Sequence, residues 1–149
     1  MKIVALLPAR LESTRIKEKL LKKIHNIPVI LHTAHRVKLC RQISRVIICT
    51  DSKKIQALLK KNNFEVLMTQ KKFNNGTERI ASVANKIKAD LIIDVHADEA
   101  ILNPTNLIKL INFHKKNKQF DIIVPYKKSI NPRDKNVVKL VFSTSHKVL

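Results

Sequence analysis

The sequence predicts a doubly wound α/β domain, in which a mostly parallel sheet carries helices on both of its faces. Short apolar runs alternate with longer segments whose apolar residues recur at helical spacing. The runs are continuously apolar instead of alternating with polar residues, which is typical of parallel strands that helices cover on both faces. The expected strands are residues 3–7, 46–49, 64–68, 91–95, 122–124 and 137–142.

Four helices are expected between or after these strands. Their inner faces are formed by Val29, Ile30, Ala34 and Val37; by Ile55, Leu58 and Leu59; by Ile80, Val83, Ala84 and Ile87; and by Leu107, Ile108 and Ile111. Pro28 suits the first turn of a helix, Ser52 is a candidate N-cap, and Asn103 followed by Pro104 is typical of a helix start. Pro8 is expected to end the first strand, because proline has no N–H to give to a sheet.

Length and composition predict one folded domain over residues 1–149, since 44% of the residues are apolar. The net charge of +19 is compatible with binding to nucleic acid or to acidic membranes. The lysines are dispersed and aromatic residues make up 4% of the chain, so we favour lysines on solvated surfaces and expect no specific nucleic-acid partner.

The sequence also indicates a protein without a membrane segment. The first predicted strand begins at residue 3, and no apolar run approaches the roughly 18 residues that a membrane helix needs. Cys40 and Cys49 do not have the spacing with histidines that a zinc site needs, and we expect both to be reduced thiols. A cytoplasmic protein is the expectation.

A basic loop follows the first predicted strand and is the first candidate for a binding site. Arg10, Arg15 and Lys19 recur at intervals of five and four residues, with Ser13 and Thr14 between them. Arginine grips phosphate oxygens with a planar fork, and lysine adds a mobile positive charge. The alternative is a solvated basic loop in a protein that is basic throughout.

Other polar groups also follow the predicted strands. Asp98 with Glu99 is a candidate for Mg²⁺, which prefers one or two carboxylates together with phosphate oxygens, although such a pair also suits a helix start. Gly76 is the single glycine of the chain, which suggests a backbone position that needs it, and Thr77 is a candidate helix cap. Ligands of doubly wound sheets bind outside the carboxyl ends of the strands, so this convergence predicts a site for an anion such as a nucleotide.

The order of these residues resembles a known family. The pattern Pro8-Ala9-Arg10-x-x-Ser13-Thr14-Arg15-x-x-x-Lys19 is similar to the opening signature of the CMP-Kdo synthetases, the cytidylyltransferases that activate 3-deoxy-manno-octulosonate (Kdo). The resemblance recurs, in order, at Thr50-Asp51, Gly76-Thr77-Glu78-Arg79, Asp98-Glu99 and Asn136-Val137-Val138-Lys139. From the residues alone, Thr50-Asp51 is equally well explained as a strand end followed by a charge.

The resemblance implies a nucleotide-diphospho-sugar transferase-like fold and a transferase that joins CTP to Kdo for lipopolysaccharide synthesis, with Mg²⁺ as cofactor. It implies catalytic roles for Arg10, Lys19 and Asp98, with the metal on Asp98 and the sugar near His96. The implied nucleotide-binding residues are Ala9, Arg10, Ser13, Arg15, Lys19, Gly76 and Arg79.

The chain departs from the family pattern in three respects. Lys17-Glu18-Lys19-Leu20 stands where the family has Pro-Gly-Lys-Pro, which puts a carboxylate beside the expected phosphate site. His96-Ala97-Asp98-Glu99-Ala100 stands where the family has Gln-Gly-Asp-Glu-Pro, and the glutamine is a sugar contact in the family. The chain is also shorter than family members, so we expect it to lack their C-terminal portion, with its further sugar contacts and the surface of their homodimer.

These departures leave alternatives open. One is a cytidylyltransferase for another acidic sugar, such as a sialic-acid-like sugar or 8-amino-Kdo. Another is a truncated, inactive remnant that only binds nucleotide.

Overall fold

The computed structural model describes residues 1–13, 16–127, 133, 138–141 and 143–144. The chain divides into two compact units, Met1–Lys109 and Leu110–Leu149, which are described separately. The expectation that residues 1–149 form a single domain stays a prediction.

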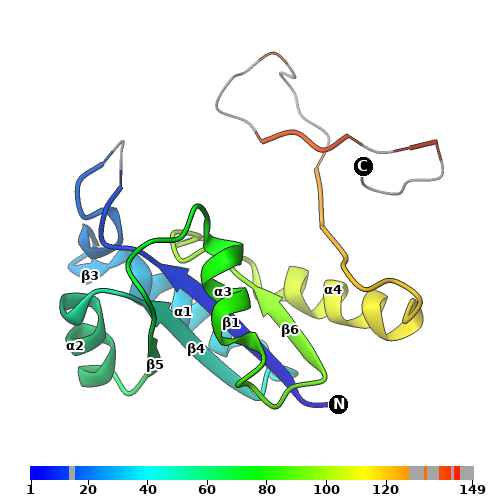
Figure 1. Cartoon of the computed structure of the whole chain (residues 1–149), viewed down its shortest axis with the longest axis horizontal. Helices are drawn as coiled ribbons and strands as arrows, with labels where there is room; N and C mark the ends of the chain where they lie inside the picture. The colour runs from blue at the N-terminus through cyan, green and yellow to red at the C-terminus, as the bar shows by residue number, and fades with distance from the viewer. Residues whose placement is uncertain (14–15, 128–132, 134–137, 142, 145–149) are drawn as a thin grey trace. The chain divides into compact units, whose positions relative to one another are not determined.

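The first unit contains a parallel four-stranded sheet with the order β5-β4-β1-β6. Its strands are β1 (Ile3–Ala9), β4 (Arg45–Thr50), β5 (Glu65–Met68) and β6 (Leu91–Asp94). The helices between them are α1 (Val29–Lys38), α2 (Lys53–Lys61) and α3 (Gly76–Ala84). In Figure 1, α3 crosses the face of the sheet toward the viewer, and α1 lies behind the sheet. The predicted doubly wound α/β fold is confirmed.

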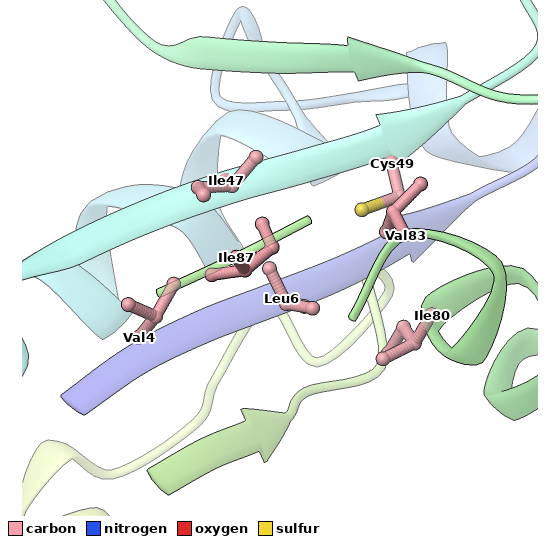
Figure 2. Packing of buried hydrophobic residues seen from close by; sticks show 7 residues of the cluster. All are labelled: Val4, Leu6, Ile47, Cys49, Ile80, Val83 and Ile87. Carbon is pink, nitrogen blue, oxygen red and sulfur yellow. The ribbon is translucent and has the colours of Figure 1, made fainter. Parts of the chain in front are cut away.

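The core explains why the strands are continuously apolar. Ile3 through Leu7 are at most 2% exposed, because both faces of β1 are covered. One face carries the cluster drawn in Figure 2, which is formed by Val4, Leu6, Ile47, Cys49, Ile80, Val83 and Ile87. Cys49 in this cluster and the buried Cys40 are free thiols, and burial raises the pKa of Cys49 to about 11. The side chains of α3 thus fix this helix to β1 and β4.

Pro8 does not end β1, contrary to the prediction from the sequence. The strand continues to Ala9, and Pro8 lies opposite Cys49 of β4. On the other side of β1, pairing with β6 extends only as far as Leu6. At Pro8 the strand therefore has a neighbour on one side only, and such an edge position tolerates a residue without an N–H.

A small hairpin between β1 and α1 was not predicted. It consists of β2 (Lys23–Ile24) and β3 (Ile27–Pro28), joined by His25 and Asn26 with φ angles of 46° and 65°. Asparagine favours this left-handed conformation, but the pair lacks the glycine that would have marked the turn in the sequence. Pro28 immediately precedes α1 as its N-cap residue and does not occupy its first turn.

The helix α4 (Pro104–Lys116) begins as predicted, because the Asn103 side chain accepts a hydrogen bond from the backbone N–H of Thr105 at 3.0 Å. No helix in the described part of the chain is long and apolar enough to cross a membrane.

The two C-terminal strands predicted from the sequence are wrong wherever they can be checked. Residues 122–124 and 138–141 form no strand, and Val137 and Phe142 lie outside the described residues. Ile122 is 82% exposed and Val138 is 91% exposed. A short apolar run fits the strand pattern, but a strand also needs a neighbour to accept its backbone hydrogen bonds, and the run itself does not encode one.

Gly76, the single glycine, starts α3 directly against β1. A Cβ atom at this position would lie 2.9 Å from Cγ and 3.2 Å from Cβ of Pro8. Its φ angle is not positive, so the close approach of the helix to the Pro8 ring requires the glycine here. The expectation that this position needs glycine is therefore explained by packing.

We expect Gly76→Ala to destabilise the protein. Overpacking costs about 1–3 kcal/mol, whereas alanine in place of a helical glycine gains at most about 0.5–1 kcal/mol. The free energy of unfolding from urea titration measures the difference. In a Pro8→Ala background, which removes the nearest ring atom, the penalty should shrink. A Gly76→Ala variant that is more stable than the wild type would contradict this account of the contact.

Candidate functional site

The order of the strands locates the switch point of the sheet. From β1 the chain passes to β4 and then β5 on one side, and it returns to β6 on the other side of β1. Ligands of doubly wound sheets bind at the carboxyl ends of the strands where the direction of winding reverses. The loops that follow β1 and β6 flank this point, and they carry the basic loop and Asp98.

Lys19 and Asp98 meet across the switch point although 79 residues separate them. Lys19 Nζ donates a hydrogen bond to Asp98 Oδ2, and about a third of each side chain is exposed. Burial raises the pKa of Asp98, but the hydrogen bond and positive charge of Lys19 outweigh it, so that the pKa is lowered overall. The structure thus brings together two of the three residues with expected catalytic roles and keeps the Asp98 carboxylate ionised at neutral pH.

The basic loop surrounds an open hollow of about 380 Å³. The lining residues are Arg10, Leu11, Glu12, Ser13, Lys17 and Glu18. Arg10 is exposed, and Ala9 is fully buried as the last residue of β1. Arg15 and Thr14 lie outside the described residues. Among the described residues, Arg10 and Ser13 therefore share one hollow, and Lys19 follows it at the switch point.

Glu18, one of the departures from the family pattern, keeps a backbone conformation that suits glycine. Its φ and ψ angles are 50° and 39°, in the left-handed region. Its carboxylate accepts hydrogen bonds from Lys54 Nζ of α2 at 2.8 and 3.0 Å. The hydrogen bond from Lys54 lowers the pKa of Glu18. Lys54, a cation that was not predicted from the sequence, thereby lies beside the basic loop.

The start of α3 is capped by Asn75, and Thr77, the predicted candidate, does not cap it. The Asn75 side chain accepts a hydrogen bond from the backbone N–H of Glu78 at 2.9 Å, and Glu78 in turn accepts one from the backbone N–H of Asn74. Hydrogen bonds from the side chain and from the backbone N–H of Asn74 lower the pKa of Glu78. Thr77 instead donates to Asp94 Oδ2 at 3.3 Å, which ties the start of α3 to the end of β6.

Arg79, an expected nucleotide-binding residue, points into the protein. Its side chain is buried, and its guanidinium donates hydrogen bonds to Asp51 and to the loop that follows β5. Thr50, in the neighbouring motif, accepts a hydrogen bond from the backbone N–H of Ser52 at 3.2 Å. The Thr50-Asp51 motif is thus occupied by contacts within the protein.

Asp94 is a polar residue of the site that sequence reasoning missed. It ends β6, and burial raises its pKa, although His96 and the hydrogen bond from Thr77 oppose this effect. The signal in the sequence is a carboxylate within the apolar run of residues 91–95, which predicts a buried strand. His96 is exposed, and its charge also lowers the pKa of Asp98, so it lies near both carboxylates.

Metal binding at this edge would depend on oxygens from a ligand. No group of three or more histidine, cysteine, aspartate or glutamate side chains within the described residues could hold a metal ion. Asp98 with its ionised carboxylate remains the candidate ligand among the expected site residues.

Comparison with known proteins shows the family of this chain. The family described as cytidylyltransferase matches residues 4–149. The chain belongs to the cytidylyltransferase family. Within this family, it is 37% identical over 149 residues to the 3-deoxy-manno-octulosonate cytidylyltransferase of Wigglesworthia glossinidia brevipalpis, covering 95% of this chain and 60% of the relative. It is 36% identical over 152 residues to the protein of the same name from a Nitratiruptor species, covering 97% and 63%.

A solved cytidylyltransferase structure agrees with this fold. The structure of CMP:2-keto-3-deoxy-manno-octonic acid synthetase complexed with CTP matches with a TM-score of 0.77 and 26% identity, over 79% of this chain and 49% of that chain. A cytidylyltransferase from Leptospira borgpetersenii matches with a TM-score of 0.69 and 21% identity, over 79% and 50%. The chain thus spans about half to three fifths of the length of these relatives. Of the motif at residues 136–139, only Val138 and Lys139 lie within the described residues.

Proposed function

We propose that this chain forms the N-terminal, nucleotide-binding part of an enzyme that activates 3-deoxy-manno-octulosonate with CTP, giving CMP-Kdo and pyrophosphate for lipopolysaccharide synthesis. The observation that carries the proposal is the contact between Lys19 and Asp98 at the switch point of the sheet. The relatives with this name, which match along almost the whole chain, support it.

The proposed reaction is a nucleotidyl transfer. The anomeric hydroxyl of the sugar attacks the α-phosphorus of CTP, a bond to the sugar oxygen forms, and the bond to pyrophosphate breaks. The protein contributes mainly alignment and stabilisation of negative charge, as in phosphoryl transfer generally. Arg10 and Lys19 would neutralise the triphosphate, together with Arg15. Ser13 in the hollow and Gly76 at the start of α3 would lie along the nucleotide, with the Ala9 backbone below it.

A divalent ion, Mg²⁺, fits the residues that are present. Mg²⁺ binds through one or two carboxylates and completes its shell with phosphate oxygens and water. Asp98 offers one ionised, partly exposed carboxylate, and the described residues contain no larger group of ligands that would enclose the metal in protein. When bound, the ion would supply further neutralisation of the phosphate charge.

The sugar specificity is a separate part of the proposal. His96 is exposed near Asp98, where the resemblance has a glutamine that contacts the sugar. Imidazole donates and accepts different hydrogen bonds from an amide, so His96 would contact Kdo differently from that glutamine. The homodimer that the resemblance implies for longer relatives is not part of the proposal for this chain, and CTP as the substrate supports a reaction in the cytoplasm.

We expect CTP with Mg²⁺ to raise the thermal unfolding temperature of the protein. A ligand at 100 times its Kd stabilises the folded state by about 2.7 kcal/mol. Lys19→Ala and Asp98→Asn should lose most of this shift, whereas Lys86→Ala, which removes an exposed lysine beyond the end of α3, should keep it. Differential scanning fluorimetry gives the comparison, and an unchanged transition of the wild-type protein at millimolar CTP would refute the proposed function.

We also expect Glu18→Gly to bind CTP more tightly than the wild-type protein does. The change removes a carboxylate from the hollow, releases Lys54 for phosphate oxygens, and places glycine where φ is 50°. Glu18→Gln is the matched variant, because it removes the charge but keeps a Cβ in the left-handed conformation. Calorimetric titration with CTP should show higher affinity for both variants. Thermal unfolding should show higher stability only for the glycine variant. Weaker binding by Glu18→Gly would mean that the pair with Lys54 supports the site.

A further inference from the structure

The guanidinium of Arg79 forms four hydrogen bonds within the protein near the carboxyl edge of the sheet. Its side chain is 5% exposed although it carries a full positive charge. Nη1 donates to Thr69 Oγ1 and, at 3.1 Å, to the carbonyl oxygen of Gln70. Nη2 donates to Asp51 Oδ2 at 2.9 Å and to the carbonyl oxygen of Lys71 at 3.4 Å. The four N–H groups of these two nitrogens thus face four acceptors within the protein.

These acceptors come from two loops at the carboxyl edge of the sheet. Asp51 follows β4, and residues 69–71 follow β5, while Arg79 itself belongs to α3. The ring of Phe73 also lies 5.2 Å from the guanidinium carbon, so a fourth residue of the second loop is held. One buried side chain therefore joins α3 to the two loops that follow β4 and β5.

The charges of Arg79 and Asp51 indicate that their ion pair is a lasting part of the folded structure. The Asp51 side chain is 16% exposed, and it neutralises the buried guanidinium. Removing one partner of such a pair leaves an uncompensated charge in a poorly solvated position. A nucleotide phosphate that drew Arg79 outward would have to break the bonds to Asp51 and to the loop at the same time.

We propose that Arg79 is a positioning residue, which fixes residues 69–73 against Asp51 and thereby shapes one wall of the nucleotide site without touching the nucleotide. The proposal rests on the proposed function, and it replaces the direct nucleotide contact that the family resemblance implies for Arg79. The same loop leads into Asn75, the cap of α3, and into Gly76, which packs on the end of β1. Loosening the loop therefore displaces the start of α3 as well.

The test compares three variants of the full chain. Arg79→Lys keeps the charge but loses the fork of donors. Thr69→Val removes one acceptor and leaves the buried ion pair intact, so it provides a variant that folds if Arg79→Lys does not. Arg45→Lys is the matched control, because Arg45 pairs with Glu65 at the opposite, amino end of β4.

Two measurements separate positioning from direct contact. Amide hydrogen exchange without nucleotide should accelerate about tenfold over residues 69–75 in Arg79→Lys, with a smaller change of the same kind in Thr69→Val. Calorimetric affinities for CTP and for CMP should both fall about tenfold in Arg79→Lys and in the same ratio, since misplacement of the loop affects both ligands alike. Arg45→Lys should change neither quantity.

Three outcomes would overturn the proposal. A loss of affinity while exchange in residues 69–75 stays at the wild-type rate indicates direct contact. A loss several times larger for CTP than for CMP indicates contact with the outer phosphates. Faster exchange with undiminished affinity shows that the loop does not shape the site. If the wild-type protein binds neither nucleotide, the proposed function fails on its own, and the claim that Arg79 orders the loop is decided by the exchange measurement alone.

Discussion

The ion pair between Lys19 and Asp98 is the interaction on which the account of this protein depends. It forms because β6 lies beside β1, so that the loops after these two strands meet at the switch point of the sheet. The position of β1 is in turn fixed by burial on both faces and by the packing of α3 against it. A lysine and an ionised carboxylate are thus held at the place where doubly wound sheets bind their ligands.

The acidic residues at the carboxyl edge of the sheet hold several of its cations in fixed positions, although the chain as a whole is very basic. The chain has 30 lysine and arginine residues but 11 aspartate and glutamate residues. At the carboxyl edge of the sheet, three of these acids each take a cationic partner: Asp98 takes Lys19, Glu18 takes Lys54, and Asp51 takes Arg79. The partnered cations are held in place, and Arg10 and Lys17 line the hollow. The site does not depend on the excess positive charge on the rest of the protein.

The sequence was sufficient to predict the fold and to place the basic loop and Asp98 at the same edge of the sheet, because apolar runs locate the strands and the topology of parallel sheets brings their carboxyl ends together. It was insufficient where a residue distant in sequence determines whether a segment forms a strand. Pro8 remains in β1 because β6 has already ended beside it, and residues 122–124 form no strand because none pairs with them. Contacts between distant residues of this kind leave no local pattern. The cap of α3 is a different case, because Asn75 followed three residues later by Glu78 is a local capping pattern that the sequence contains.

Paramagnetic broadening by Mn²⁺ tests most directly whether the pair of Lys19 and Asp98 marks a nucleotide and metal site. With CTP present, substoichiometric Mn²⁺ should broaden the amide resonances of Ala97, Asp98 and Lys19, because Asp98 would be a ligand of the ion. The resonances of Ser44, Arg45 and Glu65, at the amino ends of β4 and β5, should stay sharp. Broadening at that opposite end, or uniform broadening over the basic surface, would contradict the account.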